Sequence, residues 1–317
     1  MEESKIKVIA IVGPTASGKT SLAVELCKKI GGEVVSCDSM QIYKGMDIAT
    51  AKPTTEEMQD IPHHLIGFVE PDEPFSVYKY CEEAKKAIKD IASRGNIPVI
   101  AGGTGLYFNS LIDNIEYLSE DSDFQYREEL KKRAENEGAD VLLEELRAVD
   151  PDSAEKLHVN NVGRIIRALE IYKTTGKTKT IQNEFSKKTP SPYDVTAICL
   201  DAEDRQFLYN RINKRVDLML EAGLLNEAEA FITSPLGQTA KQAIGYKELA
   251  PYFAGEKTLN ECLDNLKMQT RRYAKRQLTW FRRDDRMNYI FIDKHPNNED
   301  IINKALEIIR RSADFEI

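Results

Sequence analysis

The run Lys7-Val8-Ile9-Ala10-Ile11-Val12 leads directly into the loop Gly13-Pro14-Thr15-Ala16-Ser17-Gly18-Lys19-Thr20, and a helical pattern covers Lys19–Ile30. The first run is short, apolar and rich in β-branched residues, which is typical of a buried strand. The loop fits the pattern G-x-x-x-x-G-K-[ST], which wraps around phosphate oxygens when it stands between a strand and a helix. The stretch therefore predicts the first strand, loop and helix of an α/β fold.

The loop from Gly13 to Thr20 is the candidate binding site for a diphosphate group. Its glycines let backbone N–H groups point inward, and the helix that follows contributes its positive N-terminal end. Lys19 supplies a mobile positive charge, and the Thr20 hydroxyl is a candidate ligand for Mg²⁺. The loop leaves open which diphosphate is bound, so an ATPase, a GTPase and a small-molecule kinase are alternatives. The strings N-K-x-D and D-x-x-G, typical of guanine-specific switches, do not occur in this sequence, which disfavours a GTPase.

Four more short apolar runs extend the α/β pattern. They predict strands at Glu33–Cys37, Ile97–Ala101, Val195–Leu200 and Tyr289–Ile292, and a further helical pattern covers Phe75–Ser93. Because strands and helices alternate, we expect a P-loop NTPase-like parallel sheet with helices on both faces.

The stretch from Ser119 to Pro192 interrupts this alternation. It is rich in charge and helix-like, and it contains no convincing strand. We therefore predict a discontinuous catalytic core, residues 1–118 and 193–317, that carries an inserted all-helical domain, residues 119–192. The exit of the insert, Lys187–Pro192, is polar and interrupted by proline, as is typical of a linker.

Two further strand ends bring polar groups to the edge where a parallel sheet binds its ligands. Asp38 follows the second predicted strand, and the turn Gly102-Gly103-Thr104-Gly105 follows the third. Asp38 has three possible roles: a Mg²⁺ ligand, a general base, or a helix N-cap together with Ser39. The glycine turn lets its backbone and the Thr104 hydroxyl approach a ligand, although it would also serve as an ordinary strand-to-helix connection.

Charge is unevenly distributed along the chain. The 317 residues carry a net charge of −8, yet 163–188 holds seven basic and two acidic residues, and 267–286 holds eight basic and two acidic residues. Segregation of this kind indicates basic surfaces for a polyanion, while ordinary solvated helix faces are the simpler alternative.

The second basic segment has helical periodicity. Its apolar side is formed by Leu263, Leu266, Tyr273 and Trp280. The opposite side carries only cations, at Lys267, Arg271, Arg272, Lys275, Arg276, Arg282 and Arg283. We therefore expect one side to pack and the other to be free for phosphates.

Several other polar residues keep two interpretations. His63 and His64 are either ligands or capping and packing groups. Arg211 and Arg215 lie on a predicted helix, where they either reach the diphosphate or pair with Asp217.

Cysteine usage and the N-terminus bear on the compartment. The five cysteines are scattered and contain no C-x-x-C pair, which favours reduced thiols and a cytoplasmic protein. The N-terminus is acidic, and the apolar run behind it is too short for a signal peptide or a membrane span, so we expect no membrane association.

With these strings assembled, the chain resembles the bacterial tRNA dimethylallyltransferases, also called tRNA isopentenyltransferases. The matching strings are the phosphate loop, Asp38-Ser39-Met40-Gln41-Ile42-Tyr43, Thr50-Ala51-Lys52-Pro53, Pro62-His63-His64-Leu65, Gly102-Gly103-Thr104-Gly105-Leu106-Tyr107, Arg164 with Arg167-Ala168-Leu169-Glu170, Gln242-Ala243-Ile244-Gly245-Tyr246-Lys247-Glu248-Leu249, and Tyr273-Ala274-Lys275-Arg276-Gln277-Leu278-Thr279-Trp280-Phe281-Arg282. They occur in order over nearly the whole chain. One departure is Ala49, where the family usually has glycine.

The resemblance implies transfer of a dimethylallyl group from dimethylallyl diphosphate to N6 of the adenosine at position 37 of tRNA, with Mg²⁺. It implies that Asp38 is the base, that Lys19 and Thr104 are catalytic, and that Thr104 and Arg127 line the channel where adenine and diphosphate meet. The adenine must leave its stack to reach a recessed diphosphate, which costs least in the anticodon loop. The expected tRNA-binding residues are Asp38, Ser39, Met40, Gln41, Thr104, Arg127, Gly163, Arg164, Ile165, Ile166 and Arg167, joined on grounds of charge by Lys267, Arg271 and Lys275.

Alternatives within and beyond this class are prenylation of free adenine nucleotides, an ATP-dependent small-molecule kinase and a non-catalytic P-loop RNA-binding protein. The first would not need the inserted domain or the basic helix. We expect a monomer without a structural metal, because the sequence lacks a C-terminal C-x-x-C…H-x-H segment.

Overall fold

The computed structural model describes residues 5–117, 123–186 and 189–312 and divides the chain into two compact units. The first unit comprises Met1–Leu111 with Pro192–Ile317, and the second comprises Ile112–Ser191. The two chain segments at the border of the second unit are joined to each other: the Asn114 side chain donates to the Pro190 carbonyl, and the Thr189 hydroxyl donates to Glu116. These bonds explain why the second unit begins before residue 119, where we predicted the insert to start.

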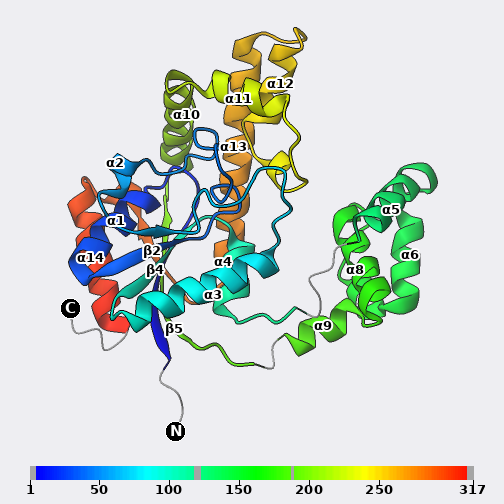
Figure 1. The fold of residues 1–317 in the computed structure, drawn as a ribbon, viewed down its shortest axis with the longest axis horizontal. Helices are drawn as coiled ribbons and strands as arrows, with labels where there is room; N and C mark the ends of the chain where they lie inside the picture. The colour runs from blue at the N-terminus through cyan, green and yellow to red at the C-terminus, as the bar shows by residue number, and fades with distance from the viewer. Residues whose placement is uncertain (1–4, 118–122, 187–188, 313–317) are drawn as a thin grey trace. The chain divides into compact units, whose positions relative to one another are not determined.

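A six-stranded parallel sheet forms the centre of the first unit (Figure 1). Its strands are β1 (Ile6–Val12), β2 (Gly32–Ser36), β3 (His63–His64), β4 (Ile97–Gly102), β5 (Tyr193–Asp201) and β6 (Met287–Phe291). The strand order is β3-β2-β4-β1-β5-β6, and every neighbouring pair is parallel. The five predicted strands are confirmed. The edge strand β3 was missed because two histidines give no apolar run.

Helices cover both faces of this sheet. The helices of the first unit are α1 (Lys19–Ile30), α2 (Thr55–Met58), α3 (Val77–Ser93), α4 (Gly105–Ile112), α10 (Arg205–Glu221), α11 (Leu224–Ile232), α12 (Tyr246–Phe253), α13 (Leu259–Phe281) and α14 (Asn298–Ser312). Two 3-10 turns, Ala240–Gln242 and Ile292–Lys294, complete it. Helices α1 and α14 pack together on one face. Right-handed crossovers direct the connection from β2 through α3 to β4 to the other face, and α3 packs against both strands.

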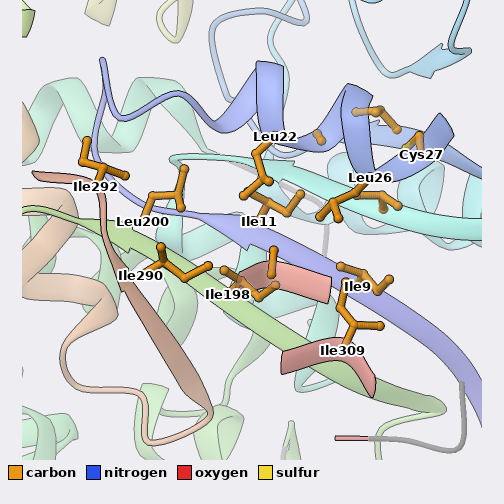
Figure 2. Packing of buried hydrophobic residues seen from close by; sticks show 14 of the residues in the cluster. Ile9, Ile11, Leu22, Leu26, Cys27, Ile198, Leu200, Ile290, Ile292 and Ile309 are labelled. Carbon is orange, nitrogen blue, oxygen red and sulfur yellow. The ribbon is translucent and has the colours of Figure 1, made fainter. Parts of the chain in front are cut away.

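The core of the first unit lies between the sheet and the helices α1 and α14 (Figure 2). Ile9 and Ile11 of β1 and Ile198 of β5 are fully buried there, and Leu22 and Leu26 of α1 pack against them. Complete burial of a side chain of this size stabilises the fold by about 1.5–3 kcal/mol. The loops at the strand ends are therefore attached to a rigid base.

The described part of the second unit is helical, as we predicted for the insert. Its helices are α5 (Phe124–Glu137), α6 (Ala139–Val149), α7 (Pro151–Glu155), α8 (Val162–Thr175) and α9 (Lys179–Phe185). Leu130, Leu142, Leu146 and Ile165 belong to its own apolar core. The predicted linker residues Lys187 and Lys188 lie outside the described residues.

Across the described residues, none of the helices combines the length and the apolar character that a membrane span requires.

Candidate active site

The candidate active site lies at one edge of the sheet, where three neighbouring strands end. The phosphate loop follows β1, Asp38 follows β2, and the glycine turn follows β4, which lies between the other two strands. Backbone hydrogen bonds join the last two segments beyond the strands: Cys37 N–H donates to Ala101 at 2.8 Å, and Thr104 N–H donates to Cys37 at 3.1 Å. The sheet therefore brings together the three segments that we selected from the sequence.

The phosphate loop needs glycine at two positions for separate reasons. Gly13 has a φ of +136°, and a Cβ atom there would lie 2.4 Å from the Leu200 carbonyl oxygen of the adjacent strand. Gly18 has a φ of +96° and turns the chain into α1. Between them, the Pro14 carbonyl accepts hydrogen bonds from Lys19 Nζ at 2.7 Å and from the Ser17 hydroxyl at 2.9 Å. The loop is thus closed around its own lysine.

Lys19 stands in an environment that disfavours its charge. Burial lowers the pKa of Lys19 to about 8, and the nearby Arg215 guanidinium acts in the same direction, while the negative charge of Asp38 opposes both. An anion that enters the loop would raise the pKa of Lys19 again, because it stabilises the charged ammonium group. The loop is therefore suited to a strongly negative ligand.

Arg211 and Arg215 of α10 both reach the phosphate loop. Arg211 Nε donates to the Ala16 carbonyl at 2.8 Å, and Arg215 reaches the Thr15 hydroxyl at 3.4 Å. Burial lowers the pKa of Arg215, with carboxylates acting in the opposite direction. The alternative partner Asp217 pairs instead with Lys267 at 2.6 Å. The structure therefore supports the interpretation in which these arginines serve the diphosphate-binding loop, and not the one in which they pair with Asp217.

Asp38 uses one carboxylate oxygen to close its own turn. Its Oδ1 accepts hydrogen bonds from Met40 N–H at 2.9 Å and Gln41 N–H at 3.3 Å, which is a capping arrangement. Within the described residues, no hydrogen bond reaches Oδ2. Asp38 is therefore fixed through one oxygen while the other is open to a proton or a metal ion.

Thr104 joins the glycine turn to the Asp38 turn. Its hydroxyl oxygen accepts the Ser39 N–H at 3.0 Å and lies 3.3 Å from the Ser39 hydroxyl. The Tyr273 hydroxyl of α13 lies near the Thr104 side chain, and burial raises the pKa of this tyrosine. We had placed Tyr273 on the packing side of the helix, and its hydroxyl was missed as part of the site.

Gln277, one helical turn after Tyr273, is a second residue that sequence reasoning missed. It is 5% exposed and bridges the two glycine-rich loops: its Oε1 accepts the Thr15 N–H at 2.9 Å, and its Nε2 donates to the Gly103 carbonyl at 2.9 Å. The signals in the sequence were its place in the matching string Tyr273–Arg282 and a four-residue spacing of polar groups on a partly apolar helix side.

A loop over residues 47–52 flanks Asp38 and is held by Glu227 of α11. The Glu227 carboxylate accepts the N–H groups of Asp47, Ile48 and Ala49 at 2.7–2.9 Å. The same loop offers the carbonyls of residues 50 and 51 to the Gln41 side chain. Glu227 thereby orients the segment against which Gln41 rests.

Ala49, the departure from the family pattern, faces a glycine. A Cβ atom on Gly245 would lie 2.8 Å from the Ala49 Cβ. The extra methyl group of Ala49 is therefore accommodated because residue 245 has no side chain. It leaves the bond from Ala49 N–H to Glu227 intact at 2.9 Å.

In the second unit, two of the residues that we expected to contact tRNA have buried side chains. Ile165 is fully buried and Ile166 is 3% exposed, and both belong to the core of that unit. They face inward because α8 is amphipathic and presents Gly163 and Arg164 to solvent. The two isoleucines therefore anchor α8 in the core of the second unit.

Arg127 and Arg167 share the buried carboxylate of Glu170. Arg127 Nε donates to one oxygen at 2.7 Å and Arg167 to the other at 2.5 Å, while Glu170 itself is fully buried. Both arginines and Glu170 lie in the second unit, so contacts within that unit hold the two arginine side chains in place. Their guanidinium groups are oriented by Glu170 and are partly exposed.

The basic side of α13 is less free than its sequence predicts. Lys267 pairs with Asp217, Arg271 donates to the Asn213 side chain at 2.6 Å, and Arg282 pairs with Asp201 at 2.8 Å. The prediction overlooked α10, which packs along α13 and supplies the first two partners.

Other parts of α13 also differ from expectation. Arg272, Lys275 and Arg276 stay exposed. Trp280 was expected to pack but is 39% exposed, and its indole lies against Gly105. The free cations of this helix are therefore fewer than the helical periodicity suggests.

His63 and His64 take packing roles. His63 Nδ1 bonds to the Ile61 carbonyl, and His64 Nε2 lies 2.7 Å from the buried carboxylate of Glu33. Arg94 and Asn96 bond to the same carboxylate, and together these groups hold the pKa of Glu33 at about 2, with Arg94 the largest influence. This network stands at the opposite end of β2 from Asp38 and is structural.

A parallel sheet that gathers a phosphate loop, two arginines of α10 and an aspartate at one edge defines a P-loop α/β enzyme core. Comparison with known families identifies the family within this class. The sequence profile described as IPP transferase matches residues 41–284, and that of isopentenyl transferase matches residues 6–66. The chain belongs to the IPP transferase family, as its resemblance implied.

Named relatives and solved structures agree with this assignment. A tRNA dimethylallyltransferase from Acetivibrio thermocellus is 48% identical over 93% of this chain and 95% of its own length. The crystal structure of a tRNA isopentenylpyrophosphate transferase from Bacillus halodurans is 43% identical and covers 96% of each chain, with a TM-score of 0.71. A eukaryotic dimethylallyltransferase acting on tRNA is 30% identical over 97% of this chain and 80% of its own, with a TM-score of 0.80.

Proposed function

We propose that this enzyme transfers a dimethylallyl group from dimethylallyl diphosphate to N6 of the adenosine at position 37 of tRNA and releases diphosphate. The observation that carries the proposal is the placement of Lys19 and Asp38 at the same edge of the parallel sheet, beyond the ends of β1 and β2 on either side of β4, close enough for their charges to interact. One group is suited to a departing diphosphate and the other to a departing proton. The group that stabilises the leaving diphosphate and the group that accepts the adenine proton thus lie at one edge of the sheet.

The phosphate loop and its two arginines bind the diphosphate end of the prenyl donor. As the allylic C–O bond breaks, negative charge grows on the diphosphate oxygens, and Lys19, Arg211 and Arg215 stabilise it. The buried setting of Lys19 strengthens this effect, since less water competes for the charge. Backbone N–H groups at the start of α1 add to the same field.

Mg²⁺ fits the oxygen donors at this edge. The Thr20 hydroxyl is a hard ligand, and the described residues hold no cluster of three or more His, Cys, Asp or Glu side chains that would form an all-protein site. Mg²⁺ usually takes one or two protein oxygens and completes its shell with substrate phosphates and water. Bound there, it would neutralise charge on the leaving diphosphate.

Asp38 accepts the proton that the adenine amine loses. The N6–carbon bond forms while the carbon–oxygen bond to diphosphate breaks, so the nitrogen becomes more acidic during the step. The turn formed by Met40 and Gln41 holds Asp38 through Oδ1, which leaves Oδ2 as the receiving oxygen. Thr104, fixed by its hydrogen bond from Ser39 N–H, lies beside the Asp38 turn.

The tRNA contacts are proposed for the exposed cations of both units. Arg164 at the start of α8, and Arg272, Lys275 and Arg276 on α13, are exposed. Arg127 and Arg167 are held by Glu170 with part of each guanidinium accessible. We further propose that the anticodon stem-loop is the recognised portion, and that the enzyme acts in the cytoplasm as a monomer.

Three parallel incubations test the function. The protein is mixed with labelled dimethylallyl diphosphate plus bulk tRNA, labelled dimethylallyl diphosphate plus AMP, or labelled ATP plus bulk tRNA. The proposal expects prenyl label in tRNA and little elsewhere. Label in AMP alone would favour prenylation of free nucleotides, and phosphate transfer from ATP without prenyl transfer would favour a kinase.

A further inference from the structure

Gln277 on α13 connects the two halves of the candidate active site through a single buried amide. The Thr15 N–H that it accepts belongs to the peptide group whose carbonyl, on Pro14, holds Lys19 Nζ. The Gly103 carbonyl to which it donates belongs to the peptide group whose N–H, on Thr104, bonds to Cys37. Because a peptide group is planar, fixing one end of each group also fixes the other end.

These bonds form one continuous chain. It runs from the Lys19 ammonium through the Pro14–Thr15 peptide to Gln277, and from there through the Gly103–Thr104 peptide to the Cys37 carbonyl. Cys37 immediately precedes Asp38. Each link spans 2.7–3.1 Å, the normal range for such bonds.

The amide of Gln277 supplies both functions that this series of hydrogen bonds needs. A backbone N–H can only donate and a carbonyl can only accept, so the bridging group must offer an acceptor at one end and a donor at the other. The site is also shaped for it: a Cβ atom on Gly103 would lie 2.0 Å from Gln277 Nε2. A glutamate of the same size would keep the bond to Thr15 but place a second oxygen against the Gly103 carbonyl.

We propose that Gln277 is a positioning residue for prenyl transfer, which sets the distance between the diphosphate held at Lys19 and the base Asp38. This inference rests on the proposed function. Gln277 touches neither substrate in this role. It acts through two peptide groups, and its effect is on the geometry in which the N6 nitrogen meets the allylic carbon.

The test compares Gln277→Leu and Gln277→Glu with the wild type in single-turnover prenyl transfer at saturating dimethylallyl diphosphate and tRNA. Misplacement of a catalytic group by about 1 Å typically costs about 10²-fold in rate, so we expect both variants to lose between 10-fold and 10²-fold. The dissociation constant for tRNA should change less than about 3-fold, because no phosphate contact is removed.

The control variant is Gln269→Leu, two helical turns earlier on α13. Among the described residues, the Gln269 amide bonds only to the Asn265 side chain, at 3.4 Å, so the rate should stay within about 2-fold of wild type. Thermal melts of all three variants show whether each is folded. Gln277→Glu is nearly isosteric and carries the test if Gln277→Leu does not fold.

A structural role alone would give a different result. Folded Gln277→Glu protein that turns over at the wild-type rate, with only a lower melting temperature, would overturn the inference. Equal losses in rate and in tRNA affinity would overturn it as well, since they would indicate a general disturbance of α13. Activity of the wild type in the same assay separates these outcomes from a failure of the proposed function.

Discussion

At the residue scale, Asp38 combines two duties that a single substitution can separate. Asp38→Asn keeps an oxygen for the N–H groups of Met40 and Gln41 and removes only the negative charge. We expect the single-turnover rate to fall by about 10²-fold or more, as is usual for loss of a general base. The affinity for tRNA should stay within about 3-fold. A rate within a few-fold of wild type would show that the carboxylate is not the base, and a raised Mg²⁺ requirement would assign it to the metal.

The pKa of Lys19 predicts a pH dependence of donor binding. Because burial lowers this pKa to about 8, the free enzyme loses its ammonium charge as the pH rises through 8. The value of kcat/KM for dimethylallyl diphosphate should therefore decline on the alkaline side of pH 8. Lys19→Ala should be far less active and should lack this decline, while its tRNA affinity stays nearly unchanged. A wild-type profile that is flat to pH 9.5 would contradict the prediction.

The same shift has a consequence for stability, with a definite sign. The folded protein disfavours charged Lys19, so between pH 8 and the ordinary lysine pKa of 10.5 the unfolded chain binds more protons at this residue. The contribution of Lys19 to the free energy of unfolding must then become more favourable as pH rises through this window. The charged lysine is thus retained at neutral pH at some cost in stability, which is typical of functional sites.

At the element scale, Glu227 attaches the loop of residues 47–52 to α11. Its carboxylate accepts three backbone N–H groups and the Tyr246 hydroxyl. In Glu227→Ala these donors lose their partner, and we expect the free energy of unfolding to fall by about 1–3 kcal/mol. Urea denaturation measures this change. A loss below about 0.3 kcal/mol would mean that water replaces the carboxylate without penalty.

Two lysines of α13, Lys267 and Lys275, are expected to contribute differently to tRNA binding. Lys275 is exposed, whereas Lys267 is already paired with Asp217. Replacing a phosphate-contacting cation should make the slope of log K against log salt less steep by slightly under one unit. We therefore expect a change of slope for Lys275→Ala and for Arg164→Ala, and little change for Lys267→Ala. The reverse order would show that α10 releases Lys267 to the tRNA.

Local sequence patterns predicted single elements well, whereas contacts between elements could be predicted only in part. The strand, loop and helix around Lys19 are local and were predicted to the residue for α1. Asp38 and Thr104 were brought together by a general rule for parallel strands. The pairing of Lys267 with Asp217 depends on the packing of α10 against α13, which helical periodicity does not contain. For the same reason, Gln277 looked like any polar residue on a helix.

At the scale of the whole molecule, the two units divide the work that we propose. The sheet unit supplies the diphosphate loop and the base, and the helical unit of residues 112–191 supplies further cations for the nucleic acid. Replacing cations of the helical unit should raise KM for tRNA while leaving KM for dimethylallyl diphosphate nearly constant. An equal rise in both constants would contradict this division.

The central claim is that one adenosine of tRNA receives the prenyl group with Asp38 as the base. An anticodon stem-loop with adenosine at position 37 is incubated with the enzyme and dimethylallyl diphosphate, digested to nucleosides and analysed by mass spectrometry. The same stem-loop with guanosine at that position is treated in parallel. We predict N6-dimethylallyl adenosine from the first stem-loop and none from the second, with a yield from Asp38→Asn lower by about 10²-fold at equal times. Prenylation of both stem-loops, or of neither while free AMP is prenylated, would contradict the claim.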